Sequence, residues 1–221
     1  MFIVKELPIQ GSHNKWMGTD IFFVENKKPK PIIVYIHGFN GFKDWGNFDI
    51  IARQFAEAGF VFVKMNLSHN GTTLANPVEF TDLDAFGRNT ISIEIEDVGF
   101  ILSWLKNKTN PYQIELDAEH IILLGHSKGG ATALLTALQQ PFVCAVVTWA
   151  SVSEAKTPWG NMSKEKLNAW RYEGVFYYHN KRTQQKLPIY YSLYQDYIQH
   201  ELAFSLKNSI QKLSIPLLIC H

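Results

Sequence analysis

The sequence predicts an α/β fold, an open and mostly parallel sheet with helices on both faces. Between residues 31 and 150, apolar strand-like runs alternate with amphipathic helical segments, and short turns join them. The 221 residues are 46% hydrophobic and 19% charged, a composition that excludes disorder, collagen and coiled coil. A chain of this length predicts a single domain with one large core and room for an insertion.

Local patterns predict the elements in order. Apolar or β-branched runs predict strands at residues 2–7, 19–25, 31–36, 60–67, 121–124, 143–149 and 215–220. Apolar residues at helical spacing predict helices at residues 48–58, 91–105 and 131–138, and the first of these stops at Gly59. Together these elements give a core at residues 1–153 and a return to the core at residues 214–221.

Residues 154–213 interrupt this alternation. Eleven aromatic residues lie between Trp159 and Phe204, and the segment has helix-like stretches and no clear strand. We expect a helical, aromatic-rich insertion that packs over one end of the sheet. Its aromatic residues suit either packing on the main domain or a half-wet pocket wall over an apolar substrate group. From Glu154 to Lys212 the insertion holds nine Lys and Arg and five Asp and Glu, which fits anionic substrates or a solvated helical surface.

One motif carries chemistry. The segment Gly125-His126-Ser127-Lys128-Gly129-Gly130 follows a predicted strand and precedes a predicted helix. The pattern G-x-S-x-G in this context is typical of a nucleophile elbow, in which a sharp turn strains the serine backbone and exposes its hydroxyl above the sheet. Glycines on either side let the strand and the helix approach closely. The alternative is a tight turn in which the serine only caps the helix.

This motif resembles the α/β-hydrolase superfamily, together with His37-Gly38 after the third strand and residues 215–221 as the seventh strand. Within it, the chain is most similar to the serine-aminopeptidase-like and dienelactone-hydrolase-like branch, which carries a helical insertion after the sixth strand. The resemblance implies a three-layer fold with a helical cap and Ser127 as the nucleophile. It also implies that the backbone N–H groups of Phe39 and Lys128 form the oxyanion hole.

The resemblance also predicts where the rest of a catalytic triad lies. In the family the acid follows the seventh strand and the histidine follows the eighth. We therefore expect the acid, the histidine, the C-terminal strand and the last helix beyond His221, and residues 1–221 alone to be inactive. Less favoured candidates within these residues are Glu154, Asp196 with His200, and the loop residue His69. His37 and His126 are expected to shape the loop and to pack beside the serine.

The function predicted is that of a serine hydrolase that cleaves an ester, a thioester or a small peptide or amide bond through an acyl-enzyme on Ser127. The alternative is a hydrolase-like binding protein without catalysis. Neither a cofactor nor a metal site is expected, because the sequence has no dinucleotide fingerprint, phosphate loop or zinc-ligand spacing. The expected partner is a small-molecule acyl substrate, and the oligomeric state is left open.

Net charge, the length of apolar runs and the cysteine content limit the other possible partners and the cellular location. The net charge of +1, without a basic block, disfavours nucleic acid. No apolar run reaches the roughly 18 residues of a membrane-spanning helix, and the N-terminus does not resemble a signal peptide. Cys144 and Cys220 lie in apolar strand-like runs, which predicts two free, buried thiols and a cytoplasmic location.

Overall fold

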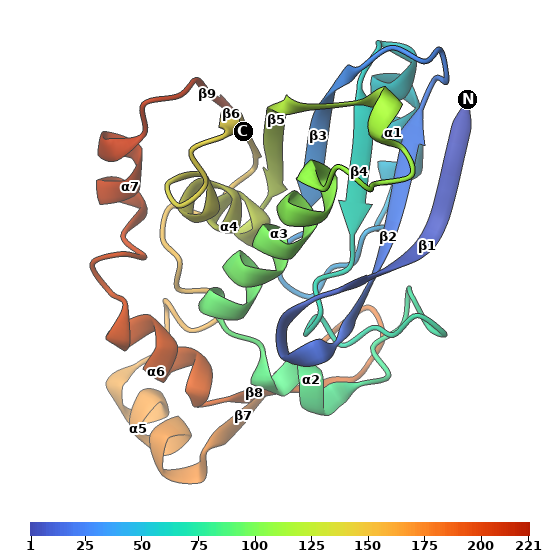
Figure 1. The fold of residues 1–221 in the computed structure, drawn as a ribbon. Coiled ribbons are helices and arrows are strands. Elements are labelled where there is room, and N and C mark those ends of the chain that lie inside the picture. Colours follow the sequence, from blue (N-terminus) through green and yellow to red (C-terminus); the bar gives the residue numbers. More distant parts are fainter.

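A seven-stranded sheet in the order β1-β2-β4-β3-β5-β6-β9 forms the centre of the computed structural model, which describes residues 1–221 (Figure 1). The strands pair in parallel from β4 to β9, and only β1 with β2 and β2 with β4 are antiparallel. The mostly parallel sheet predicted from the sequence is confirmed. The strands are β1 (Phe2–Gln10), β2 (Trp16–Phe23), β3 (Lys30–Ile36), β4 (Val61–Met65), β5 (Leu116–His126), β6 (Val143–Trp149) and β9 (Leu217–Cys220).

Helices cover both faces of this sheet, so the fold has three layers. On one face, α3 (Ile91–Lys106) and α4 (Lys128–Ala137) share a cluster of 23 buried apolar residues with the strands. On the other face, α1 (Phe48–Glu57) packs through its apolar side, and the rings of Tyr35 and Phe48 stack with centroids 3.9 Å apart. This is the three-layer arrangement that the family resemblance implies. Shorter elements are η1 (Ser12–Asn14), α2 (Leu83–Arg88) and η2 (Gln113–Glu115).

The predicted insertion contains two strands, so the expectation of a strand-free helical segment was wrong. A hairpin of β7 (Val175–His179) and β8 (Lys186–Tyr190) follows α5 (Lys164–Glu173), and α6 (Ser192–Gln199) and α7 (Leu206–Lys212) come next. Gly174 ends α5 in the left-handed region, with φ of 76°, and turns the chain into β7. Because aromatic residues occur throughout this segment, the alternation of a strand does not stand out in the sequence.

Most of the insertion, with α5, the β7–β8 hairpin and α6, lies at the lower end of the sheet in Figure 1, where strand β4 also ends, whereas α7 lies at the left of the view, on the side of α4. Its aromatic residues mostly pack: Trp159, Trp170, Tyr197 and Phe204 belong to a second apolar cluster of 16 buried residues. That cluster also takes in residues from the N-terminal part of α3 and from α4. Tyr172, by contrast, is 93% exposed. The packing alternative therefore accounts for most of the aromatic residues of the insertion.

The two cysteines are free, as predicted, but each is half-buried rather than buried. Strand β9 runs parallel to β6 with Cys220 opposite Trp149, the last residue of β6, whereas Cys144 lies near the start of β6. The two thiols therefore lie at opposite ends of one strand pair. No helix has both the length and the apolar character that crossing a membrane requires.

Candidate active site

Ser127 is the single residue between the end of β5 and the start of α4, and its backbone has a conformation that non-glycine residues rarely adopt. Its φ is 55° and its ψ is −121°. The serine N–H donates to the carbonyl of Trp149 over 2.9 Å, and its carbonyl accepts from Gly130 N–H over 3.0 Å, which fix the turn. The Ser127 side chain makes no capping hydrogen bond to α4. The capping alternative is therefore wrong, and the turn has the strained backbone expected of a nucleophile elbow, whose catalytic role stays a prediction.

Glycine is required on both sides of this turn. A Cβ atom on Gly125 would collide with the backbone of Gly129, and a Cβ on Gly129 would collide with the carbonyls of Ile36 and His37. The turn is therefore wedged against the end of β3. This contact explains why the motif places small residues two positions before and after the serine.

The loop that follows β3, residues 37–47, lies directly beside the nucleophile candidate. A Cβ atom on Gly38 would be 3.0 Å from the Cβ of Ser127. The next residue, Phe39, has a backbone N–H without a hydrogen-bond partner in the protein. Lys128 is the first residue of α4, where helix N–H groups lack intrahelical acceptors. The two N–H groups expected to form an oxyanion hole therefore flank Ser127, and their catalytic role stays a prediction.

The side chain of Lys128 is buried and forms an ion pair that sequence reasoning missed. Its Nζ donates to Glu94 Oε1 over 2.6 Å, and Glu94 also accepts from Thr132 Oγ1 and Asn89 Nδ2. Burial opposes ionisation of Glu94, but the Lys128 charge and these hydrogen bonds together hold its pKa below the usual value. Glu94 lies 34 positions before Lys128, so no local spacing links the two residues in the sequence.

Two histidines adjoin Ser127 along the chain or in space, and neither hydrogen-bonds to it. Burial lowers the pKa of His37, whose Nδ1–H donates to the Gly38 carbonyl over 2.9 Å while Nε2 accepts from Leu67 N–H over 3.2 Å. His37 therefore shapes the loop, as expected. His126 is half-buried against the ring of Phe48, and burial lowers its pKa too.

The other candidate acids and bases serve elsewhere. His69 is buried beside Ser68 and His13, and burial lowers its pKa to about 4. Asp196 accepts hydrogen bonds from Ser92 and so ties α6 to the start of α3, with His200 Nδ1 3.3 Å from its carboxylate. The exposed Glu154 pairs with Lys156. No hydrogen bond joins any of these side chains to the Ser127 hydroxyl.

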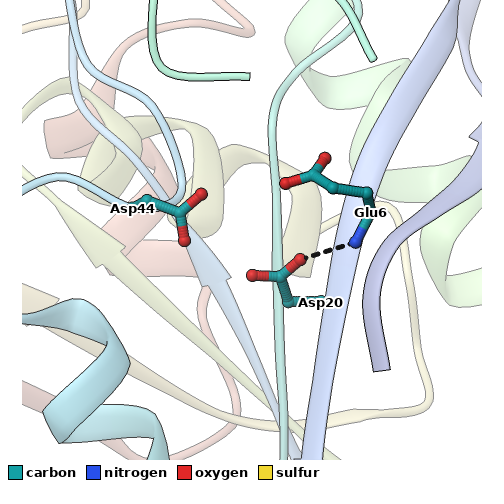
Figure 2. Close-up of side chains that lie close together, drawn as sticks. All are labelled: Glu6, Asp20 and Asp44. Carbon is teal, nitrogen blue, oxygen red and sulfur yellow. Dashed lines mark hydrogen bonds between the residues drawn. The ribbon is translucent and has the colours of Figure 1, made fainter. Parts of the chain in front are cut away.

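Three carboxylates, from Glu6, Asp20 and Asp44, point toward one another at the side of the sheet (Figure 2). One oxygen atom from each carboxylate lies within 4.8 Å of the other two, a spacing that suits a metal ion. The ammonium of Lys43, however, contacts all three, at 2.5 Å from Glu6, 2.9 Å from Asp20 and 2.5 Å from Asp44. Lys64 also binds Asp20 and Asp44. The charge a cation would supply is already present, so the cluster is a partly buried ion network around the fully buried side chains of Lys43 and Asp20.

This network anchors the loop after β3. Lys43 belongs to that loop, its side chain is fully buried, and its N–H donates to Asn66 Oδ1 over 2.7 Å. Asp20 lies on β2, and its carboxylate also accepts from the N–H of Glu6 on β1 over 2.9 Å (Figure 2). The loop that carries Phe39 is therefore held to the antiparallel part of the sheet by charge-assisted hydrogen bonds.

A mostly parallel sheet between two helical layers, with a strained strand-to-helix turn at Ser127, has the architecture of an α/β-hydrolase fold. The BD-FAE family model matches residues 19–144, more than half of the chain, and the chain belongs to this family. A second model, of the Esterase family, matches residues 101–193, which include Ser127 and the β7–β8 hairpin. No curated protein sequence matches the chain significantly.

Solved structures show the same fold at low sequence identity. The esterase domain of a Rhodothermus marinus protein is 16% identical, with a TM-score of 0.60 over 99% of this chain and 75% of that one. Est1E from Butyrivibrio proteoclasticus with bound ferulic acid is 15% identical, with a TM-score of 0.64 over 96% and 77%. The α/β-hydrolase GrgF from Penicillium sp. sh18 is 15% identical, with a TM-score of 0.68 over 99% and 89%. The narrower likeness to serine-aminopeptidase-like or dienelactone-hydrolase-like enzymes stays a prediction.

Proposed function

We propose that this protein is a serine hydrolase in which the Ser127 hydroxyl attacks the carbonyl carbon of an ester. The acyl group is transferred to Ser127 Oγ as the alcohol leaves, and water then hydrolyses the acyl-enzyme. The observation that carries this proposal is the backbone of Ser127, held at φ 55° and ψ −121° at the N-terminus of α4 without a capping role. Backbone strain of this kind persists only where the surrounding structure enforces it, and it is concentrated at active sites.

The oxyanion that forms during the attack needs donors that are already in place. The free N–H of Phe39 and the N–H of Lys128 flank the serine and fit this role, with the positive end of the α4 dipole behind them. The loop of Phe39 is fixed by the ion network, and the elbow is fixed by its glycine contacts. Neither donor therefore has to reorganise as charge develops on the substrate.

The comparisons favour an ester over a peptide bond. A model of the Esterase family matches the stretch with the elbow, and two of the similar structures are an esterase domain and a ferulic acid complex. Thioesters and small amides share the same carbonyl chemistry and are secondary candidates. The substrate we propose is a small acyl compound in the cytoplasm, a location that agrees with two unpaired cysteines.

One observation favours the second candidate, a binding protein of hydrolase fold. Ser127 Oγ has no histidine partner within residues 1–221, and an unactivated serine hydroxyl is a poor nucleophile. The two candidates share the site around Ser127 and differ in whether a base reaches this residue. They are therefore separated by reactivity and not by affinity.

The deciding experiment uses the full-length protein and its Ser127→Ala variant. We expect a fluorophosphonate probe to label the wild type on Ser127, and short 4-nitrophenyl esters to be hydrolysed by the wild type and not by the variant. Ser153, a serine outside the motif, provides the control variant Ser153→Ala, which should label and react like the wild type. Absence of labelling and turnover in the wild type would favour the binding protein.

A further inference from the structure

A small recess lies beside the elbow, at the point where the insertion meets the loop after β3. It has a volume of about 20 Å³, and its lining includes Gly38 and the two residues of the proposed oxyanion hole, Phe39 and Lys128. Phe86 of α2, with Ile189 and Leu193 of the insertion, lines its apolar side. A space of this volume holds one water-sized group.

Two polar groups that line this recess lack the partners that burial demands. Lys128 is 3% exposed, and of the three N–H bonds on its ammonium, only the one to Glu94 Oε1 has a partner in the protein. Asn89 donates from Nδ2 to Glu94, while its buried Oδ1 has no hydrogen-bond partner at all. Both side chains donate to Glu94 Oε1, so the recess is lined by a strong donor and a free acceptor that lie close together.

A hydroxyl group satisfies both at once, because its oxygen accepts from an ammonium and its hydrogen is donated to an amide oxygen. Because the recess shares Phe39 and Lys128 with the proposed oxyanion hole, a group that occupies it lies next to the carbonyl of a bound ester. We propose that the recess binds a hydroxyl group carried by the acyl portion of the ester, so that the preferred substrates are esters of short hydroxy acids. This inference rests on the proposed function.

A resident water supplies the same hydroxyl chemistry as a substrate. Two matched pairs of esters distinguish a bound water from a bound substrate hydroxyl. Methyl lactate is compared with methyl propionate, and methyl 3-hydroxybutyrate with methyl butyrate, by acid release in a pH-stat. Each rate is divided by the hydroxide-catalysed rate of the same ester, which removes the electronic effect of the hydroxyl. For the full-length protein, we expect the corrected kcat/KM of at least one of the two hydroxylated esters to exceed that of its unsubstituted partner by at least about tenfold.

Variants locate this preference. Asn89→Leu removes the free acceptor at nearly constant volume and should reduce the preference to about one. Thr132→Val is the matched control, because it removes a hydrogen bond to the same Glu94 from a residue outside the recess, and it should keep the preference. The melting temperature of each variant is measured beside the kinetics.

Each outcome is decisive. Equal corrected rates for both pairs in the wild type would mean that the recess holds water only, and would overturn the proposal even if Asn89→Leu failed to fold. A preference that survives Asn89→Leu would also overturn it. Labelling of Ser127 by a fluorophosphonate without turnover of any of the four esters would remove the proposed substrate class and keep the nucleophile. Absence of both labelling and turnover would reject the proposed function, and the inference with it.

Discussion

Asn180, in the turn between β7 and β8, donates a hydrogen bond from Nδ2 to the side-chain oxygen of Asn40 over 2.9 Å. Asn180 is 1% exposed, and its own Oδ1 accepts from the N–H of Arg182 over 3.0 Å. The Arg182 guanidinium in turn lies 4.3 Å from the ring centroid of Trp45. One hairpin turn thus holds two points of the loop that carries Phe39, and the insertion helps to position a donor of the proposed oxyanion hole.

Replacement of Asn180 should test this positioning. Asn180→Ala leaves Asn40 and the turn amides without their buried partner, at a cost of about 1–3 kcal/mol in the free energy of unfolding. Because the loop of Phe39 is then less constrained, we expect kcat to fall more than KM rises. Asn168→Ala, on the exposed side of α5, is the matched control and should leave both the kinetics and the stability near wild type. Equal effects of the two variants would contradict a positioning role.

The strain at Ser127 makes a second prediction, about stability. Glycine adopts a φ of 55° without a Cβ penalty, so Ser127→Gly should raise the free energy of unfolding by about 1–2 kcal/mol relative to Ser127→Ala. Urea denaturation of the two inactive variants measures the difference directly. If Ser127→Gly is less stable than Ser127→Ala, the backbone conformation at the elbow costs nothing.

The third prediction concerns the buried ion pair of Lys128 and Glu94. Glu94→Gln leaves the Lys128 ammonium without a counter-charge and should destabilise the fold by about 3–5 kcal/mol. The double variant Glu94→Gln with Lys128→Met removes both charges and should recover most of this loss. Unfolding in urea of both single variants and the double variant gives the coupling. Additive effects would show that the two side chains do not interact as the 2.6 Å contact indicates.

A fourth prediction concerns pH, through two buried groups on either side of Ser68. Burial lowers the pKa of His69 to about 4, so the stability that neutral His69 contributes is present above pH 6.5 and is lost as the pH falls toward 4. Burial raises the pKa of Asp97 to about 6, so its contribution has the opposite sign and is lost as the pH rises from 3.8 toward 6. The two effects oppose each other near pH 5.

Replacement of the histidine should expose this opposition. In His69→Gln the loss on acidification is removed, and the free energy of unfolding at pH 5 relative to pH 7 should rise by about 1–2 kcal/mol over the same difference in wild type. His120→Gln, at an exposed histidine, is the control and should leave the difference unchanged. An unchanged difference in His69→Gln would mean that folding does not shift the pKa of His69.

The sequence predicts those parts of this molecule that depend on neighbours along the chain. The elbow is one, because the strand, the serine and the glycines that allow its conformation all lie within a few residues. The β7–β8 hairpin is not, because a strand in a segment rich in Tyr and Phe shows no alternation against that background. The Lys128–Glu94 pair and the Lys43 ion network join residues far apart in the sequence, and only the folded chain brings them together.

The second apolar cluster joins the insertion to Ala131 and Leu135 of α4 and to Ile91 and Ile95 of α3. The insertion and the helix that carries the elbow therefore share a core and should open in one cooperative step. In evolutionary terms, such an insertion cannot be exchanged as a module, because a replacement must fit the same apolar surface of two core helices. If the recess binds substrate as proposed, its preference changes most easily through point substitutions in the few side chains that line it, such as Ile189 and Leu193, and not through replacement of the insertion.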